Sequence, residues 1–261
     1  MPEWLILTYA ALVGAVAGSF LNVCIHRWPL GESVVRPRSR CPGCGGAIAW
    51  YDNVPVLSWL LLRGRCRHCR QPISIQYPLV ELAVALVWLA AVWRLGPSVE
   101  ALRMALFLTM LLGIALTDAR HMVIPDQLSL GGMVIGLAMA PLAGGIDLLD
   151  AVIGAGGGYV FLWALKISAE RVFRKPALGV GDIHMIAMIG AFAGPGGVLL
   201  AILLGSFLGL LVGVPLSWWR GRLTLMGTYL PLGTFLAVGA AIAFVWGEAL
   251  FTWYLRLMVG G

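Results

Sequence analysis

Residues 197–217 read GVLLAILLGSFLGLLVGVPLS, a run of 21 residues without a charged side chain. A helix that crosses the hydrocarbon core of a membrane needs about 20 consecutive apolar residues. Of the 261 residues in the chain, 60% are hydrophobic and 11% are charged, and the mean hydropathy is +0.91. Soluble domains carry roughly a quarter charged residues, so this composition excludes a soluble globular protein and a disordered one. We expect an all-α polytopic membrane protein.

Similar apolar stretches recur along the chain and predict about eight transmembrane helices. Their approximate limits are 4–25, 78–95, 101–118, 127–143, 147–168, 183–195, 197–217 and 229–254. The first stretch is long enough to remain as a span, unlike a cleaved signal peptide. We therefore expect three parts: residues 1–26 as the first transmembrane helix, 27–76 as a small module outside the lipid, and 77–261 as a transmembrane helical bundle.

The basic residues indicate which side of the membrane the small module occupies. The net charge is +6, and eight of the 18 basic residues are arginines between Arg27 and Arg70. Basic clusters between apolar spans are typical of cytoplasmic loops, where they also attract anionic lipid headgroups. We expect residues 27–76 to lie in the cytoplasm, in contact with membrane lipids. Because the charges follow the loops between spans, we expect no nucleic-acid partner.

Two CxxC pairs within this module indicate a metal site. Cys41-Pro-Gly-Cys44 and Cys66-Arg-His-Cys69 are separated by 21 residues, and each pair can present two thiolates to one ion. Four thiolates hold Zn²⁺ tetrahedrally with no open position, so the metal would fold the module and not catalyse. Disulfides and redox motifs are the alternatives. The cytoplasmic arginines disfavour disulfides, and a matched pair without a βαβ pattern is unlike a redox motif.

Two carboxylates stand at the ends of predicted spans. Asp118 ends the span at 101–118, and Asp182 follows Gly179-Val180-Gly181 at the start of the span at 183–195. Ionisable groups in spans are costly, and the alternation of spans puts both aspartates at similar depth near the cytoplasmic face. One such carboxylate can activate a water as a base while the other acts as an acid toward a carbonyl oxygen. We expect Asp118 and Asp182 to be catalytic.

Aspartates at the start of a helix also have a purely structural interpretation. Asp182 could simply cap the helix that it begins, and Asp126, which follows Pro125, has the same interpretation. The glycines at 179 and 181 permit a tight turn and the close approach of a packed helix or a bound peptide. A second aspartate at matched depth favours the catalytic interpretation.

Several long motifs give the chain a resemblance to a known family. They are Gly18-Ser19-Phe20-Leu21-Asn22-Val23, Ser39 to Cys44, Trp50 to Pro55, Gly64 to Cys69, Tyr77 to Glu81 and Gly179 to Asp182. On these motifs, nearly the whole chain resembles the type IV prepilin peptidases, which are bifunctional leader peptidases and N-methyltransferases of the GxGD aspartyl protease class. The resemblance implies that Asp118 and Asp182 are the catalytic pair. One departure is His184, where many relatives have lysine.

The resemblance also implies substrates, a location and a co-substrate. It implies cleavage of the basic leader from type IV prepilins or type II secretion pseudopilins at the cytoplasmic face of the bacterial inner membrane. Methylation of the new N-terminal residue with S-adenosylmethionine would follow. The zinc loop of Cys41, Cys44, Cys66 and Cys69 is typical of the bifunctional members. The glycine run at 154–158 is expected to serve helix packing and not to bind a nucleotide.

Two other classes of protein compete with this interpretation. A transporter could use Asp118 and Asp182 as a proton relay, but it would place the carboxylates near the middle of the bilayer and would show repeated spans. A non-catalytic assembly factor could use the zinc loop for docking, which leaves both aspartates without a role. We therefore expect an enzyme.

Overall fold

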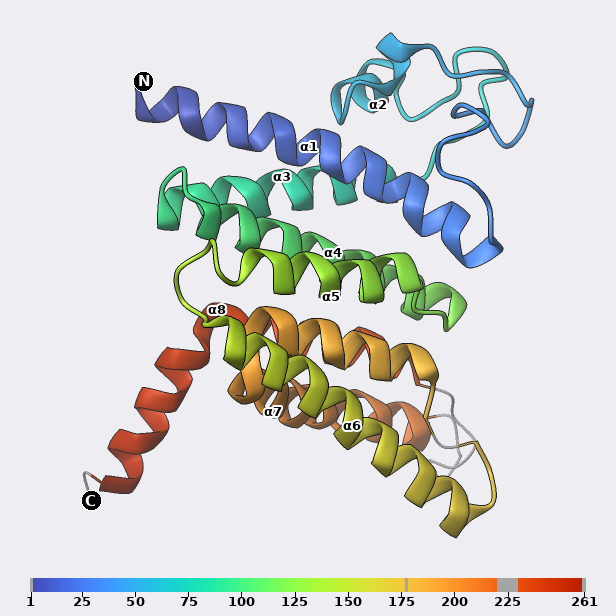
Figure 1. The fold of residues 1–261 in the computed structure, drawn as a ribbon. Coiled ribbons are helices and arrows are strands. Elements are labelled where there is room, and N and C mark those ends of the chain that lie inside the picture. Colours follow the sequence, from blue (N-terminus) through green and yellow to red (C-terminus); the bar gives the residue numbers. More distant parts are fainter. Residues whose placement is uncertain (1, 177, 220–229, 260–261) are drawn as a thin grey trace. The chain divides into compact units, whose positions relative to one another are not determined.

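The computed structural model describes residues 2–176, 178–219 and 230–259, and this part of the chain is helical without a strand (Figure 1). The long helices are α1 (Glu3–Arg27), α3 (Gln76–Leu95), α4 (Val99–His121), α5 (Asp126–Met139), α6 (Leu148–Phe173), α7 (Val180–Trp219) and α8 (Leu232–Val259). The short helices η1 (Trp28–Leu30), η2 (Trp50–Asn53) and α2 (Leu57–Leu61) lie between α1 and α3. The chain divides into two compact units, Met1–Thr109 and Met110–Gly261.

Six helices in the described part of the chain are long and apolar enough to cross a membrane, namely those at 3–30, 76–95, 99–121, 148–173, 180–216 and 232–258. This confirms the prediction of an all-α polytopic membrane protein. The predicted number of eight spans is not confirmed. The predicted span at 127–143 corresponds to α5, which has 14 residues, and the spans at 183–195 and 197–217 both fall within α7. The predicted three-part division remains a prediction.

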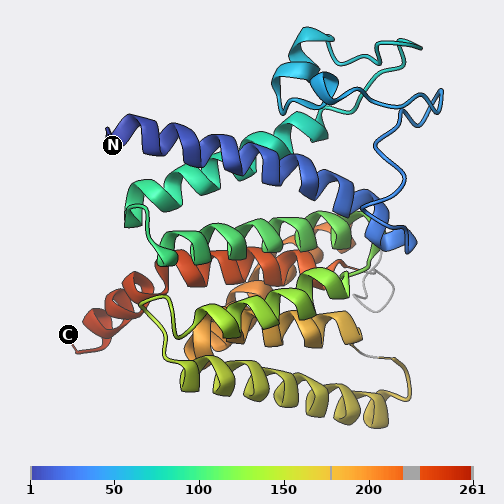
Figure 2. The ribbon, with the colours of Figure 1, turned by 45° about the horizontal axis from the view of Figure 1, so that its top comes forward.

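The first unit is built on the packing of α1 against α3, which lie side by side in Figures 1 and 2. Two glycines of α1 make the approach close. A Cβ at Gly14 would lie 2.9 Å from the Cα of Ala85, and one at Gly18 would lie 2.8 Å from the Cα of Glu81. Small residues that let backbones approach are the usual means by which helices associate in lipid.

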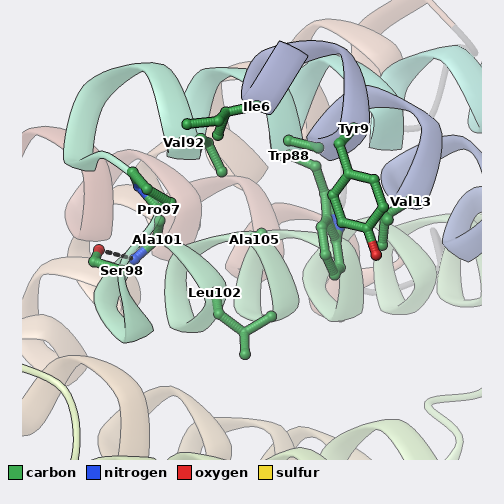
Figure 3. Close-up of a pocket in the computed structure, with 11 residues that line it drawn as sticks. Ile6, Tyr9, Val13, Trp88, Val92, Pro97, Ser98, Ala101, Leu102 and Ala105 are labelled. Atoms are coloured by element: carbon green, nitrogen blue, oxygen red, sulfur yellow. Dashed lines mark hydrogen bonds between the residues drawn. The ribbon is translucent and has the colours of Figure 1, made fainter. Parts of the chain in front are cut away.

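A shallow apolar groove opens in the first unit between α1, α3 and the beginning of α4 (Figure 3). It encloses about 170 Å³ and is lined by side chains that include Ile6, Tyr9, Trp88 and Val92. Ser98 accepts a hydrogen bond from the Ala101 N–H at 3.1 Å, which caps the start of α4 beside the groove (Figure 3).

The second unit is organised around α7, which packs against α5, α6 and α8. Glycine pairs bring the backbones together, because a Cβ at Gly190 would lie 2.2 Å from the carbonyl carbon of Gly154 in α6. A Cβ at Gly239 in α8 would lie 2.6 Å from the backbone nitrogen of Gly205 in α7. The side chains of Met185, Ile186, Met188 and Phe192 are fully buried in this core. The expectation that the glycine run of α6 serves helix packing is consistent with these contacts.

A kink divides α7 at Gly194, whose backbone dihedrals are φ 66° and ψ −174°. This region of backbone space is essentially restricted to glycine. Pro195 follows and has no backbone N–H to continue the helical hydrogen bonds. The parts of α7 on either side of Gly194 are two helices that correspond to the two predicted spans. The chain reverses between them, because Ile186 and Val198 both lie against Gly158 of α6.

Candidate active site and metal centre

Asp118 lies in the last turn of α4, where its side chain is buried and meets the beginning of α8. Its Oδ2 accepts hydrogen bonds from the backbone N–H of Thr234 at 2.8 Å and from the Thr234 hydroxyl at 3.2 Å. The same hydroxyl lies 3.1 Å from the carbonyl oxygen of Ala115, a second acceptor. Thr234 therefore fixes the orientation of the Asp118 carboxylate from a helix that begins more than a hundred residues further along the chain.

The beginning of α8 is suited to hold a carboxylate. The first N–H groups of a helix have no partner within it, and the helix dipole places partial positive charge there. Gly233 leaves room for the contact, because a Cβ at this position would lie 3.0 Å from Asp118 Oδ2. An anion at this point of the fold is thus stabilised by backbone groups as well as by Thr234.

Asp182 lies in the first turn of α7, and its neighbour Gly181 packs against the same isoleucine as Gly233 at the start of α8. A Cβ at Gly181 would lie 2.9 Å from Cβ of Ile124, and one at Gly233 would lie 2.7 Å from Cδ1 of the same isoleucine. Ile124 therefore packs against both glycines. The charge of Asp118 acts electrostatically on Asp182. The structure thus brings together the two aspartates that the sequence singled out.

The capping interpretation of Asp182 also has a counterpart in the structure. Its carboxylate accepts a hydrogen bond from the backbone of Gly179, the residue before α7. This contact matches one half of a capping box, in which the side chain of the third helical residue accepts a hydrogen bond from the backbone N–H of the cap residue. The cap therefore holds the Asp182 carboxylate at the beginning of α7, within electrostatic range of Asp118.

Asp126, the first residue of α5, pairs with His184 on α7. The distance from His184 Nδ1 to Asp126 Oδ1 is 2.8 Å, and the imidazole ring stacks on Tyr159 of α6 with ring centroids 6.2 Å apart. The sequence predicts that Asp126 caps a helix and shows His184 only as a departure from the family pattern. No local pattern predicts that the two side chains pair, because they lie 58 positions apart in the chain.

The four predicted metal ligands lie together in the first unit. The sulfur atoms of Cys41, Cys44, Cys66 and Cys69 are all within 4.8 Å of one another. Cys41 Sγ and Cys69 Sγ are 3.7 Å apart. Tetrahedral zinc with Zn–S bonds of about 2.3 Å requires sulfurs roughly 3.8 Å apart, so the four residues fit a zinc ion.

Each CxxC pair forms the same type of turn. The N–H of Cys41 donates to the carbonyl oxygen of Gly46, and the N–H of Cys66 donates to that of Gln71, both at 2.9 Å. Gly45 and Arg70, each four residues after the first cysteine of its pair, have φ of 67° and 60°. The two turns are therefore equivalent, and each presents its two sulfurs to a common point.

The backbone of these turns stabilises thiolate at the first cysteine of each pair. Backbone N–H groups of Cys44 and Gly43 lower the pKa of Cys41 to about 6, and those of Cys69 and His68 lower the pKa of Cys66. The N–H of Gln71 acts in the same direction on Cys69, but burial and the neighbouring sulfurs outweigh it and raise the pKa of that thiol to about 11. Four thiolates in one place repel one another unless a cation lies among them, which is the condition that a divalent metal satisfies.

Two further contacts tie the module together and to α3. The Arg67 side chain donates to Asp52 at 2.8 Å, which lowers the pKa of that carboxyl group. Glu81 of α3 is buried and accepts a hydrogen bond from the N–H of Val56 at 2.7 Å. Val56 has a φ of 62°, which is unusual for a β-branched residue, so Glu81 holds this turn against backbone strain.

Models of known protein families match both halves of the chain. The Bacterial Peptidase A24 N-terminal domain matches residues 12–95, and the Type IV leader peptidase family matches residues 105–214. A prepilin leader peptidase/N-methyltransferase from Pseudomonas putida is 38% identical over 97% of this chain and 94% of its own length. The chain belongs to the type IV leader peptidase family.

Other members of this family show similar identity. The prepilin leader peptidase/N-methyltransferase from Aeromonas hydrophila is 36% identical over 97% of this chain and 94% of its own length. That from Myxococcus xanthus is 40% identical over 84% of this chain, and the match covers 65% of its own length. No solved structure matches the chain significantly. The transporter interpretation of the two aspartates has no support among these relatives.

Proposed function

We propose that the chain cleaves the basic leader from type IV prepilins or type II secretion pseudopilins and then N-methylates the new N-terminal residue. The observation that supports the cleavage reaction best is the convergence of Asp118 and Asp182. The two carboxylates come from helix ends that meet at Ile124, and both lie within residues 105–214, the part matched by the Type IV leader peptidase family. Relatives covering nearly the whole chain carry both activities in their names.

In the proposed mechanism, one aspartate accepts a proton from a water molecule while the other donates a proton to the oxygen of the scissile carbonyl. The water oxygen bonds to the carbonyl carbon, and the tetrahedral intermediate collapses as the C–N bond breaks and the leaving nitrogen takes up a proton. No covalent intermediate with the protein forms. Thr234 occupies Oδ2 of Asp118, so we assign Oδ1 of Asp118 to the water.

The four cysteines are proposed to hold one structural Zn²⁺. With four thiolate ligands the ion has no position for a substrate, so its contribution would be to the folding of the module. Cys41, Cys44, Cys66 and Cys69 would bind it, and the Asp52–Arg67 pair would support the turn that carries the second pair.

N-methylation requires a methyl donor, which we propose to be S-adenosylmethionine. The glycine-rich stretch of α6 does not suit this co-substrate, because Gly154 and Gly158 lie inside a helix and pack against α7. We assign no residue of this chain to the donor and derive no step through it. The second activity thus rests on the relatives, which are named N-methyltransferases.

We further propose that the zinc module and the aspartates face the cytoplasm and that the protein resides in the bacterial inner membrane. The arginines of residues 27–76 support this orientation under the positive-inside rule, and they would lie close to anionic lipid headgroups.

The proposed active site is tested by amide substitutions that preserve shape. We expect Asp118→Asn and Asp182→Asn to reduce cleavage of a precursor pilin in detergent by roughly 10²- to 10⁴-fold, since each removes a proton-transferring group. Asp147→Asn is the matched control, because Asp147 is exposed at the start of α6. Cleavage at the wild-type rate by Asp118→Asn or Asp182→Asn would contradict the proposed mechanism.

A further inference from the structure

The short helix α2 lies within the zinc module (Figure 1) and has an exposed apolar face. Leu57, Leu60 and Leu61 are three and four positions apart, a spacing that places them on one side of a helix. They are 58%, 56% and 81% exposed, whereas Ser58 of the same helix is buried. Neighbouring exposed apolar side chains of this kind mark an interaction surface.

Hydrogen bonds within the module fix the direction of this face. The Ser58 hydroxyl donates to the carbonyl oxygen of Tyr51 at 2.9 Å and accepts from the N–H of Val54 at 3.0 Å. The indole N–H of Trp59 donates to the carbonyl oxygen of Ile73 at 3.1 Å. The side chains of Ser58 and Trp59 are thus bound to the module, and the leucines of α2 are turned outward.

A contact with α3 sets the depth of α2 relative to the membrane. The N–H of Val56, the residue before α2, donates at 2.7 Å to the buried carboxylate of Glu81, which lies in the second turn of α3. The span Gln76–Leu95 has 20 residues, which corresponds to about 30 Å of helix and to the thickness of the hydrocarbon core. Its first two turns therefore lie at one boundary of that core, and α2 begins at the same depth.

The residues around α2 are those of a membrane interface. Arg63 and Arg65 follow the helix and are exposed. Trp50 belongs to η2, which packs beside α2, and its side chain is 83% exposed. Tryptophan is enriched between headgroups and hydrocarbon, and arginine is attracted to anionic headgroups. Leucines, an exposed indole and two arginines together have the composition of a segment that lies in the plane of a membrane interface.

We propose that α2 is an interfacial anchor that inserts Leu57, Leu60 and Leu61 among lipid acyl chains. Arg63 and Arg65 lie at anionic headgroups beside it. The zinc module is then held on the membrane surface at three points, namely the ends of α1 and α3 and the face of α2. The depth of α2 and the charge of the two arginines favour an anionic lipid surface over an apolar peptide as the occupant. The anchor does not depend on either catalytic activity.

Photocrosslinking in vesicles identifies what covers this face. A photoreactive phenylalanine analogue is placed at position 61 of the full-length protein, in vesicles of phosphatidylcholine and phosphatidylglycerol. Position 35 is the matched control, because Val35 is 77% exposed in the same module and Leu61 is 81% exposed. We expect the yield of lipid adducts at position 61 to be several-fold higher than at position 35. Position 57 repeats the test should the protein with the analogue at position 61 not fold.

The arginines give a second prediction. Adding phosphatidylglycerol to phosphatidylcholine vesicles should raise the yield of lipid adducts at position 61 by roughly threefold or more. The double variant Arg63→Gln and Arg65→Gln should lose this dependence. The double variant Arg38→Gln and Arg40→Gln is the charge-matched control and should keep it, because both of these exposed arginines are remote from α2 in the sequence of the module.

Three results would overturn the proposal. The first is an equal yield of lipid adducts at positions 61 and 35. The second is an adduct at position 61 with a second copy of the chain in place of lipid, which would make the leucine face a contact between copies. The third is an adduct there with an added precursor in place of lipid, which would make the face a docking site for substrate. An unchanged midpoint of thermal unfolding in detergent shows that each variant is folded.

Discussion

Asp118 depends on a distant residue for its orientation. Thr234 donates to it from both its backbone N–H and its hydroxyl, at 2.8 Å and 3.2 Å. Hydrogen bonds to a charged group contribute more to stability than neutral ones, roughly 1.5–3 kcal/mol each. The hydroxyl can be removed without losing the backbone contact, so its contribution to the site can be measured separately.

Replacing Thr234 should therefore weaken catalysis without unfolding the protein. Thr234→Val keeps the shape of the side chain and the backbone N–H but removes the hydroxyl. We expect kcat for precursor cleavage to fall by roughly tenfold or more, the equivalent of one hydrogen bond to a charged group. Thr234→Ser restores the hydroxyl and should recover most of the activity. Equal activity of the valine variant and the wild type would show that the hydroxyl does not orient Asp118.

The residues of the site differ in how readily the sequence reveals them. Asp118 and Asp182 stand out because a carboxylate at the end of an apolar span is rare. Thr234 gives a weaker signal, since Pro231-Leu232-Gly233-Thr234 marks only the beginning of a helix. Its contact with Asp118 spans 116 positions, and no local pattern encodes such a pairing.

Close packing of α6 on α7 positions the helix that carries Asp182. Gly154 and Gly190 face each other with no space for a side chain, since a Cβ at Gly154 would lie 2.6 Å from the Gly190 carbonyl oxygen. The atoms in contact are backbone atoms, which cannot move aside as a flexible side chain would. The separation of the two helices is thus set by these glycines.

A single methyl group at this contact should push the helices apart. We expect Gly190→Ala to reduce the free energy of unfolding by about 1–3 kcal/mol, as overpacking commonly does. The midpoint of thermal unfolding in detergent should fall accordingly. Gly157→Ala is the control on α6, because a Cβ there would meet no atom within 4 Å. A Gly190→Ala protein as stable as this control would contradict the packing argument.

The shape of α7 shows what hydropathy can and cannot predict. The sequence Gly194-Pro195-Gly196-Gly197 marks an interruption, and the prediction of a boundary near residue 195 is consistent with the kink at Gly194. The glycines and the proline interrupt the apolar run, and the structure has two helices, one on either side of this point. The predicted span at 127–143 extends beyond the end of α5, because residues 140–143 are apolar but are not part of the helix.

In the whole molecule, residues 27–76 form a module that we expect to fold only with a bound metal ion. The sequence predicts the four cysteines correctly as a cluster, because CxxC spacing fixes the local turn and the two turns need only meet. The backbone geometry of those turns, including the left-handed Arg70, is not visible in the sequence.

Metal analysis tests this module. We expect about one zinc per chain in purified protein, and its loss when Cys41 and Cys66 are both changed to Ser. The pKa of Cys41 is lowered to about 6 but that of Cys69 is raised to about 11, so zinc binding at neutral pH must displace the proton of Cys69, and at lower pH that of Cys41 as well. Zinc affinity should therefore weaken steadily as the pH falls, which a competition titration with a chelator at several pH values would measure. Folded, active protein without any metal would refute the structural role.

The most direct test of the account compares the two activities of one Asp182→Asn sample. We expect the wild type to cleave a precursor pilin in detergent and the variant to have lost cleavage. We also expect the same variant preparation to methylate pre-cleaved pilin, which would show that it is folded and that cleavage alone depends on the aspartate pair. Cleavage at the wild-type rate by Asp182→Asn would contradict the assignment of Asp118 and Asp182 as the catalytic pair.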